Sequence, residues 1–565
     1  MRRLTKALPL LALLSIVSAL STIHVDPVNV QEEDGIVDQT KVPDVQVASF
    51  RKQVVHTNTQ YKRNMIVDIP QKDVDIPPKD VKTGFTKGPF NLLDTYVSLI
   101  NATPYRWHLT YNSSYQLKNW DHEWPTYIMP GASVTVHANN HGQTATYDAA
   151  GEVTYELEQT KQPASFQVQY RSGLRHDVWI QFRDQLKTLN NDVGTELNLG
   201  FLRTPGGVGF VLAGKEGDFV SNNGPAQWMQ SQLSDIGHLP LRELLLPRSH
   251  DSGMWVGNHR LGVGLFGSSL TQNNTLYYQL DHGGIRVVDY RPFLLHKSFY
   301  AAHGVMLGPF FHGYLGASLT DMITEFNNFT QQHPGELYIW DIHGDDARSG
   351  DRHYQPLNDN EFDVLFQVLK TIRWRAAVPD NQDPTLRPLN SFISPGTRQT
   401  GRSSVLVRVP ASWAMRTSFP GPKEGFISAA SFPLTSRRSK TEHLNNLVVD
   451  QIKRLREARP SRNSTMHNMD WFFTQTDYHA SFPWVPITEL SRSSWRALYG
   501  RLWRALSDTT YPNMMSLDAI HDNSLKALAM VVNKCLAARR CGSLGGKVTV
   551  PKRKEDVDKE GGVGW

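Results

Sequence analysis

The sequence predicts an α/β protein in which a β-rich region precedes a parallel β/α barrel. Three observations support this prediction. At 565 residues the chain is longer than one hydrophobic core usually serves, so two folded parts are expected. Short runs of alternating apolar and polar residues fill the first part. In the second part, apolar runs alternate with amphipathic helical patterns.

The first 89 residues are expected to lie outside the folded parts. Arg2, Arg3 and Lys6 precede an apolar run and a small-residue cleavage site, which is the pattern of a secretory signal peptide over residues 1–21. The apolar run is shorter than the roughly 20 residues that span a bilayer, so we expect a secreted protein, with a signal anchor as the alternative. Residues 22–89 have the composition of a linker or propeptide.

Two further features agree with an extracellular location. The sequence holds five N-glycosylation sequons, at Asn101, Asn112, Asn273, Asn328 and Asn463, which favour a glycoprotein. Cys535 and Cys541 are close enough in sequence for one local disulfide, and the alternative is two small residues at a helix end.

Residues 90–215 are predicted to form a β-rich, sandwich-like domain. Runs such as TYVSLI, ASVTVHA, VTYEL and SFQVQY are separated by turn residues, as in half-buried antiparallel strands. Trp107, Trp120 and Trp124 are expected in its core, because large aromatic side chains mostly serve burial. Sugar stacking and membrane contact are the alternatives for these three residues.

Residues 236–541 are predicted to form a TIM-type (β/α) barrel, complete or with missing helices. The candidate strands are LRELLLP, IRVVDYR, ELYIWDI, SVLVRV, DWFFTQT and NMMSLDA. Amphipathic helical patterns begin near Ser318, Glu361, His443 and Ser524. The charged residues 542–565 are expected to be a disordered tail. A net charge of only +5 does not favour a nucleic-acid partner.

The ends of the predicted strands, and one loop, carry two histidines, an arginine and three carboxylates: His250, Asp251, Asp289, Arg291, His303 and Asp518. Cleavage of a phosphodiester by an internal hydroxyl needs such groups. A neutral imidazole accepts the hydroxyl proton, a protonated imidazole donates a proton to the leaving alkoxide, and a guanidinium offsets phosphoryl charge. Carboxylates orient the two rings.

At these motifs the sequence resembles the phosphatidylinositol-specific phospholipase C family, X-domain-like phosphodiesterases that use a β/α barrel. The resemblance lies between about Leu239 and Arg540, in PRSHDSGM, QLDHGGIRVVDYR, AAHG, FNNFTQQHPGELYIWDIHGD and NMMSLDA. It implies a secreted phosphodiesterase that cleaves a phosphoinositide-type phospholipid through a cyclic inositol phosphate. It also implies transient contact with a membrane surface.

The resemblance implies a role for each residue. His250 would be the general base on the inositol 2-hydroxyl, with Asp518 as its carboxylate partner. His303 would be the general acid, assisted by Asp251, and Arg291 would hold the phosphate. The remaining substrate-binding positions are Asp289, Asp345, Arg408 and Asp477.

Two arginines set this chain apart within the family. Arg291 stands where calcium-dependent members carry a metal-binding carboxylate, which implies the bacterial-type arrangement without a metal or other cofactor. A fixed guanidinium supplies the positive charge that a cation otherwise would. Arg248 stands where the family has glycine, so the loop is expected to differ, since glycine alone adopts positive φ at low cost.

Other functions stay open at this point. Asp341, His343 and Asp345 alternate along one predicted strand, with Asp346 beside them. Such a cluster suits calcium or magnesium, as in a metal-dependent glycerophosphodiesterase or a sphingomyelinase-like barrel. A different class is a catalytically silent surface protein that binds glycan or lipid.

The G-x-G-x-x-G run that begins at Gly262 lacks the βαβ context of a dinucleotide site. We expect a mobile rim loop there instead. Its apolar residues, among them Leu261, Val263 and Phe266, would either contact a bilayer or pack beneath the loop.

Overall fold

The computed structural model describes residues 94–544 except 141–147, 174, 345–346, 381, 395–401, 477–479 and 481–484. The predicted signal peptide and the segment 22–89 lie outside the described residues, as does nearly all of the predicted tail. Residues 79–565 belong to one compact unit.

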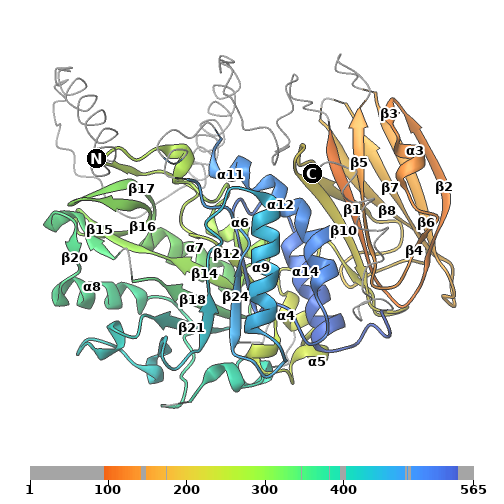
Figure 1. Ribbon diagram of the computed structural model, residues 1–565. Coiled ribbons are helices and arrows are strands. Elements are labelled where there is room, and N and C mark those ends of the chain that lie inside the picture. Colours follow the sequence, from red (N-terminus) through yellow and green to blue (C-terminus); the bar gives the residue numbers. More distant parts are fainter. Residues whose placement is uncertain are drawn as a thin grey trace, which may run out of the picture. The chain divides into compact units, whose positions relative to one another are not determined.

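Eight parallel strands form the central sheet (Figure 1), in the order β22-β21-β18-β14-β12-β25-β24-β23. Their bounds are β12 (Leu246–Ser249), β14 (Val287–Tyr290), β18 (Leu337–Ile342), β21 (Ser404–Val409), β22 (Phe426–Ser428), β23 (Leu434–Ser436), β24 (Met466–Asp470) and β25 (Met514–Leu517). Within the described residues no pairing joins β22 to β23. The predicted barrel is therefore present as an open one.

Four of the six candidate strands each contain an observed strand, namely β14, β18, β21 and β25. The other two were misplaced. Leu241–Glu243 form a short 3-10 helix, and β12 begins only at Leu246. The strand expected over DWFFTQT ends at its first residue, Asp470. Strands β22 and β23 were not predicted, because three residues are too few to show a period.

The four predicted helices are present as α7 (Leu319–Gln332), α8 (Asp359–Leu369), α9 (Leu444–Ala458) and α14 (Ser524–Val531). Ser318 caps α7, since its hydroxyl accepts a hydrogen bond from the backbone of Asp321. Asn358 and Glu361 form a capping box at α8. Helix α9 packs beside β24, and α14 packs beside β12 (Figure 1).

A second sheet of six strands occupies the segments expected to be rim loops. Its order is β13-β17-β16-β15-β19-β20. The bounds are β13 (His259–Leu261), β15 (Pro292–Leu295), β16 (Ser298–Leu307), β17 (Phe310–Ser318), β19 (Arg348–Ser349) and β20 (Gln355–Pro356). A small core of its own includes Phe293, Phe311 and Leu315. His303 consequently lies on a strand, β16, rather than in a loop.

Residues 95–221 form two further sheets, in the orders β11-β10-β1-β5-β3 and β4-β2-β6-β7-β8-β9. The bounds are β1 (Thr95–Ala102), β2 (Trp107–Tyr115), β3 (Leu117–Lys118), β4 (Tyr127–Ile128), β5 (Ser133–Asn140), β6 (Ala150–Leu157), β7 (Ala164–Arg171), β8 (Asp177–Asp184), β9 (Glu196–Gly200), β10 (Gly207–Ala213) and β11 (Val220–Ser221). Most neighbours are antiparallel as expected, but β1 and β10 are parallel. Trp107, Trp120 and Trp124 are buried in the core between strands, so the core interpretation is confirmed. The division into domains stays a prediction.

The strand pair β1 and β10 packs against the helices that follow β24. Ile100, Val211 and Val220 belong to the same hydrophobic core as Tyr499 and Met530. At this contact the indole nitrogen of Trp503 donates a hydrogen bond to the carbonyl oxygen of Gly131 over 3.0 Å. The two parts of the chain thus share apolar packing.

The structure bears on two of the features associated with secretion. Cys535 and Cys541 form the local disulfide. Asn101 is fully buried, and its amide nitrogen donates to the carbonyl oxygens of Tyr105 and Ile128, which leaves no room for a glycan in the folded protein. The sequons at Asn273, Asn328 and Asn463 are exposed. None of the described helices is long and apolar enough to cross a membrane.

Candidate active site

The predicted catalytic residues converge at the carboxyl ends of neighbouring parallel strands, where β/α barrels keep their chemistry. His250 and Asp251 follow β12, Arg291 follows β14, and Asp518 follows β25. The six-stranded sheet contributes His303 from β16. All five side chains are brought together, although they come from segments far apart in the chain.

His250 is held in one orientation. Its Nδ1 lies 2.7 Å from Oδ1 of Asp518, and its ring stacks on Phe472 with centroids 3.8 Å apart. The backbone carbonyl of His250 accepts hydrogen bonds from Thr271 and Gln272. The second ring nitrogen, Nε2, is buried without a hydrogen-bond partner among the described residues. Nε2 can accept a proton when Nδ1 carries the ring hydrogen and donates it to an ionised Asp518.

Asp251 lies between the two histidines. One of its oxygens, Oδ2, is 3.7 Å from Nε2 of His250 and 3.7 Å from Nε2 of His303, while the other pairs with Nε of Arg291. His303 Nδ1 lies 2.9 Å from the carbonyl oxygen of Ser269. Because a carbonyl can only accept, Nδ1 of His303 carries the proton. The ring centroids of His250 and His303 are 5.9 Å apart.

Burial sets the protonation of these groups. It lowers the pKa of His250 well below its ordinary value, and the positive charge of Arg291 adds to the effect. The same two causes lower the pKa of His303 to about 4. Burial and the negative charge of Asp251 raise the pKa of Asp518 well above its ordinary range. Both histidines are therefore neutral near pH 7.

Arg248 is a candidate site residue that the sequence analysis did not select. We expected it to alter a loop, but it lies within β12 and is almost fully buried. Its guanidinium pairs with Asp289 over 3.2 Å and with Asp341, and its Nη2 lies 2.8 Å from Nε2 of His343. The available signal was its position two residues before His250, since side chains two apart in extended backbone point to the same side. The left-handed backbone of this turn falls at Asp251 instead, with φ 44°.

The predicted substrate-binding residues have different outcomes. Asp289 lies in the site and accepts a hydrogen bond from the backbone nitrogen of Asp251 over 3.1 Å. Arg408 pairs with Asp341 over 2.6 Å. Asp345 and Asp477 lie outside the described residues. Asp470, at the carboxyl end of β24, was missed because the candidate strand was placed too far along the chain.

Guanidinium groups lie next to the carboxylates that were considered as metal ligands. Burial opposes ionisation of Asp341, but the charges of Arg248 and Arg408 outweigh it and hold its pKa well below the ordinary range. His250, Asp251 and Asp289 also bring potential ligand atoms within 4.8 Å of one another. Arg291 pairs with the carboxylates of Asp251 and Asp289. A divalent cation at either cluster would have to share its ligands with fixed positive charges.

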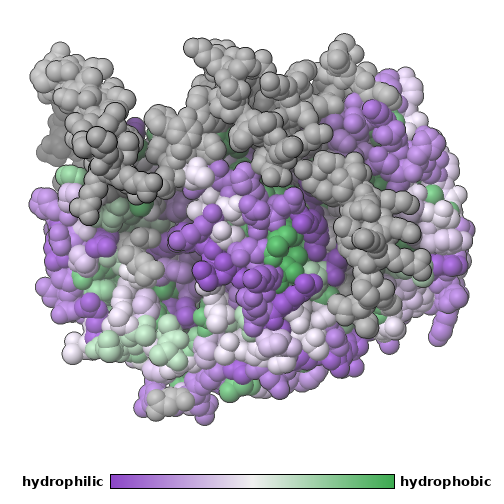
Figure 2. All heavy atoms as spheres, viewed as in Figure 1, coloured by the Kyte–Doolittle hydropathy of each residue, from purple (hydrophilic) through white to green (hydrophobic). Residues whose placement is uncertain are grey.

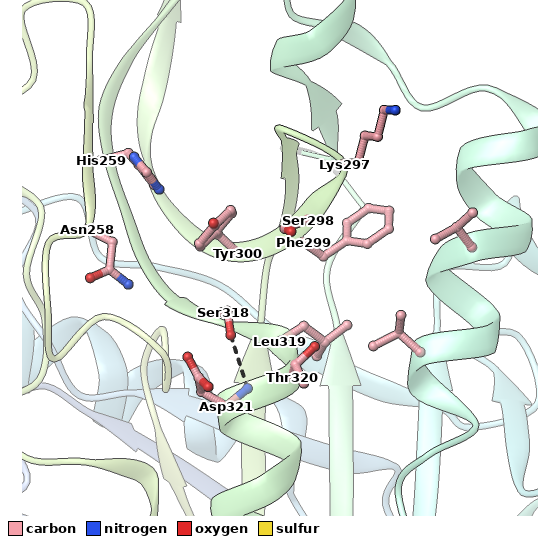
Figure 3. Close-up of a pocket in the computed structure, with 12 residues that line it drawn as sticks. Asn258, His259, Lys297, Ser298, Phe299, Tyr300, Ser318, Leu319, Thr320 and Asp321 are labelled. Atoms are coloured by element: carbon pink, nitrogen blue, oxygen red, sulfur yellow. Dashed lines mark hydrogen bonds between the residues drawn. The ribbon is translucent and has the colours of Figure 1, made fainter. Parts of the chain in front are cut away.

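A cavity of about 640 Å³ opens onto His250, Asp289 and Arg291. It is lined by Arg248, His250, Asp289, Arg291, His343, Ser436, Arg437, Arg438, Ser439, Lys440, Arg454, Asp470 and Phe472. A second cavity, of about 570 Å³, lies where the six-stranded sheet meets α7 and α8 (Figure 3). It is lined by side chains such as His259, Lys297 and Asp321, and none of the predicted site residues reaches it. Of these two cavities, only the first is lined by predicted site residues, among them His250 and Arg291.

Exposed apolar side chains gather on the six-stranded sheet and the loop beside it. Val305 and Phe310 flank the turn between β16 and β17, and Val263 and Phe266 lie in the glycine-rich segment; all four are more than one-third exposed. On the face shown in Figure 2 the described surface is mostly hydrophilic, with small apolar spots. The predicted membrane contact remains a proposal, for which these four residues are the candidates.

Comparison with known proteins gives structural matches only. No family model and no curated protein matches the chain. A solved structure of phosphatidylinositol-specific phospholipase C from Staphylococcus aureus is similar with a TM-score of 0.40 and 13% identity, covering 55% of this chain and 97% of that chain. A structure of a mutant of that enzyme has a TM-score of 0.38 and 14% identity, covering 55% and 98%. The proposed function therefore rests on the site and on the sequence motifs.

Proposed function

We propose that this protein is a phosphodiesterase of the phosphatidylinositol-specific phospholipase C type. The observation that carries the proposal is the pair of imidazoles of His250, which is buried, and His303, which is partly buried, with ring centroids 5.9 Å apart and Arg291 beside them. Each imidazole has its own anchor, Asp518 for His250 and the Ser269 carbonyl for His303. This arrangement suits one base, one acid and one phosphate-binding group close together. His250 and Arg291 line the cavity, and His303 lies beside them without being one of its lining residues.

The proposed reaction transfers one phosphoryl group within the substrate. Nε2 of His250 accepts the proton of the inositol 2-hydroxyl, and that oxygen forms a new bond to phosphorus. The bond from phosphorus to the diacylglycerol oxygen breaks, and Nε2 of His303 donates a proton to the leaving oxygen. The products are a cyclic inositol phosphate and diacylglycerol. Arg291 offsets the charge that develops on the phosphoryl oxygens.

The substrate itself would prepare the acid. His303 is neutral near pH 7, because burial and Arg291 hold its pKa at about 4. A bound phosphodiester brings a negative charge next to the ring, which favours the protonated form. Asp251, 3.7 Å from Nε2 of His303, favours it further. We propose no metal, since Arg248 and Arg291 already supply fixed positive charge.

The test uses the purified protein with phosphatidylinositol vesicles in excess chelator, with release of inositol phosphate followed by phosphorus NMR. We expect a cyclic phosphate signal, and a rate about 10² to 10⁴ lower in His250→Ala, the range for loss of a general base. Lys453→Ala is the matched control, because Lys453 is 72% exposed and does not line the cavity. A signal only after addition of calcium or magnesium would favour the metal-dependent alternative. No turnover under any condition would favour a silent binding protein.

A further inference from the structure

In the β-rich region, one side of the sheet β4-β2-β6-β7-β8-β9 lies outside the hydrophobic core. Along β7, Phe166 and Val168 belong to the core, so Gln167 and Gln169 point to the opposite side of the sheet. Strands β2, β6, β8 and β9 lie in the same sheet (Figure 1) and place paired residues next to these two. We call this side, with Gln167, Gln169 and Arg171 on β7 and their paired neighbours, the outer face.

Three aromatic side chains border the outer face. Tyr111 and Tyr115 on β2 are 49% and 57% exposed, and Trp179 on β8 is partly exposed. Strand pairing places Trp179 in the row of Ser113, midway between the two tyrosines. Four residues along a strand and three strand spacings across a sheet both correspond to about 14 Å. The three rings therefore enclose a surface about 14 Å across.

Hydrogen-bonding side chains fill the surface between these rings. Nε2 of Gln169 donates to Oε1 of Gln167 over 2.7 Å, and Nε2 of Gln167 donates to Oγ1 of Thr154 over 3.2 Å. Nε of Arg183 donates to Oε1 of Gln181 over 3.3 Å. The bonds connect β6 with β7 and fix Arg183 along β8. The donors and acceptors of this surface are thus held in defined positions.

Positive and negative groups are mixed on the outer face. Arg171 lies over the ring of Trp179, 5.1 Å from its centroid, and pairs with Glu196 over 3.2 Å. Further carboxylates on the same side are those of Glu152, Glu156 and Asp177. A polyanion or an anionic membrane would meet these carboxylates and be repelled by them. The charges of the outer face therefore suit a neutral partner.

We propose that the outer face binds a neutral polysaccharide chain. Sugar rings present apolar C–H faces, which pack on aromatic rings, and hydroxyl groups, which both donate and accept hydrogen bonds. Amide, guanidinium and carboxylate groups in fixed positions match neighbouring hydroxyl groups. A bilayer would instead need a contiguous apolar patch, and a peptide that adds as a strand would bind a sheet edge and not its face. The inference does not depend on the proposed function, since none of these residues belongs to the candidate active site.

Binding to insoluble polysaccharides tests the proposal on the whole protein. The probes are particles of cellulose, chitin and β-1,3-glucan, and bound protein is measured by its depletion from the supernatant over a range of concentrations. We expect saturable binding to at least one of them. Tyr115→Ala and Trp179→Ala should each weaken it about tenfold, because each removes one aromatic contact. Trp179→Tyr keeps a ring and should retain most of the affinity.

The matched control is Trp374→Ala, which removes an indole that is 45% exposed between α8 and β21; it should bind as the parent protein does. Because the Tyr115 side chain is mostly exposed, its removal tests binding without disturbing the core. Absence of binding to all three polysaccharides would overturn the proposal, and so would full affinity in both Tyr115→Ala and Trp179→Ala. Binding to phosphatidylcholine vesicles that is lost in the same two variants, without polysaccharide binding, would assign the outer face to a membrane and reject the proposal.

Discussion

Burial suits His250 as a base and opposes His303 as an acid. A base must be neutral to accept a proton, and the lowered pKa of His250 keeps it so over most of the pH range. An acid must be protonated, yet burial and Arg291 lower the pKa of His303 to about 4. At neutral pH only a small fraction of the protein would therefore have His303 in the form that the proposed reaction needs.

This conflict predicts an acidic pH optimum. We expect kcat/KM, measured on a soluble inositol phosphodiester, to fall about tenfold per pH unit above about pH 4, as His303 loses its proton. The falling limb of kcat should lie at higher pH, because bound phosphate raises the pKa of His303. The residual activity of His303→Gln should show no such limb. A kcat/KM limb at the ordinary histidine value would contradict the assignment.

Arg248 is predicted to stabilise the fold, apart from any role with substrate. Its side chain lies between two carboxylates that are as deeply buried as itself, Asp289 and Asp341. Arg248→Met would remove one of the two arginines that pair with each carboxylate, leaving Arg291 with Asp289 and Arg408 with Asp341. We expect a loss of up to about 3–5 kcal/mol, the cost of breaking a buried ion pair. Urea unfolding should show this loss in the free energy of unfolding. Lys453→Met, at an exposed position, should stay within about 0.5 kcal/mol of the parent protein.

Individual residues could be selected from the sequence where their chemistry is distinctive and their strand ends are sharp. His250, Asp251 and Arg291 are of this kind, and the structure places them together. Asp470 was not selected because the candidate strand DWFFTQT was placed to begin at this residue, whereas β24 ends there. Arg248 was noticed only as a departure from glycine. Its partners Asp289 and Asp341 come from other strands, and their proximity appears only in three dimensions.

At the scale of elements, local pattern was sufficient for helices and insufficient for the six-stranded sheet. Helices α7, α8 and α9 run over whole apolar stripes, so their period is visible. Strands β16 and β17 contain glycines and histidines that hide any alternation, and the sheet joins them to β13 across the glycine-rich segment. For this reason the sequence predicted a loop at His303, where the structure has a strand. Pairing between distant segments cannot be derived from one local pattern.

The hairpin of β16 and β17 positions His303 through close backbone contact. A Cβ atom on Gly313 would lie 2.3 Å from the carbonyl oxygen of His303, so Gly313→Ala must displace the strand that carries the proposed acid. Displacement by about 1 Å can cost about 10²-fold in rate. We expect kcat on phosphatidylinositol vesicles to fall by up to that factor while KM changes little. Gly173→Ala, with its nearest contact at 3.7 Å, is the control. An unchanged kcat would show that the hairpin does not position the acid.

At the scale of the whole molecule, the two predicted domains are joined by a common core. The sheet of β1 and β10 contributes Ile100 and Val211 to the same cluster as Leu498 and Met530. The sequence pattern separates these regions, because one alternates with period two and the other with strand–helix units. Such periodicity cannot show which faces are buried against each other. Because of this packing, we expect the stability of each part to depend on the other, wherever the boundary between them lies in the sequence.

The shared core predicts a single cooperative unfolding transition in calorimetry, since elements that share one apolar core unfold together. The decisive variant is Gly209→Val in β10, because a Cβ atom there would lie 2.5 Å from the ring of Tyr499. Overpacking of this kind costs about 1–3 kcal/mol, and the whole transition should move to lower temperature. Gly173→Ala, in the turn between β7 and β8, should leave it in place. Two separate transitions, of which only one responds to Gly209→Val, would show that the β-rich region and the open barrel unfold as independent units.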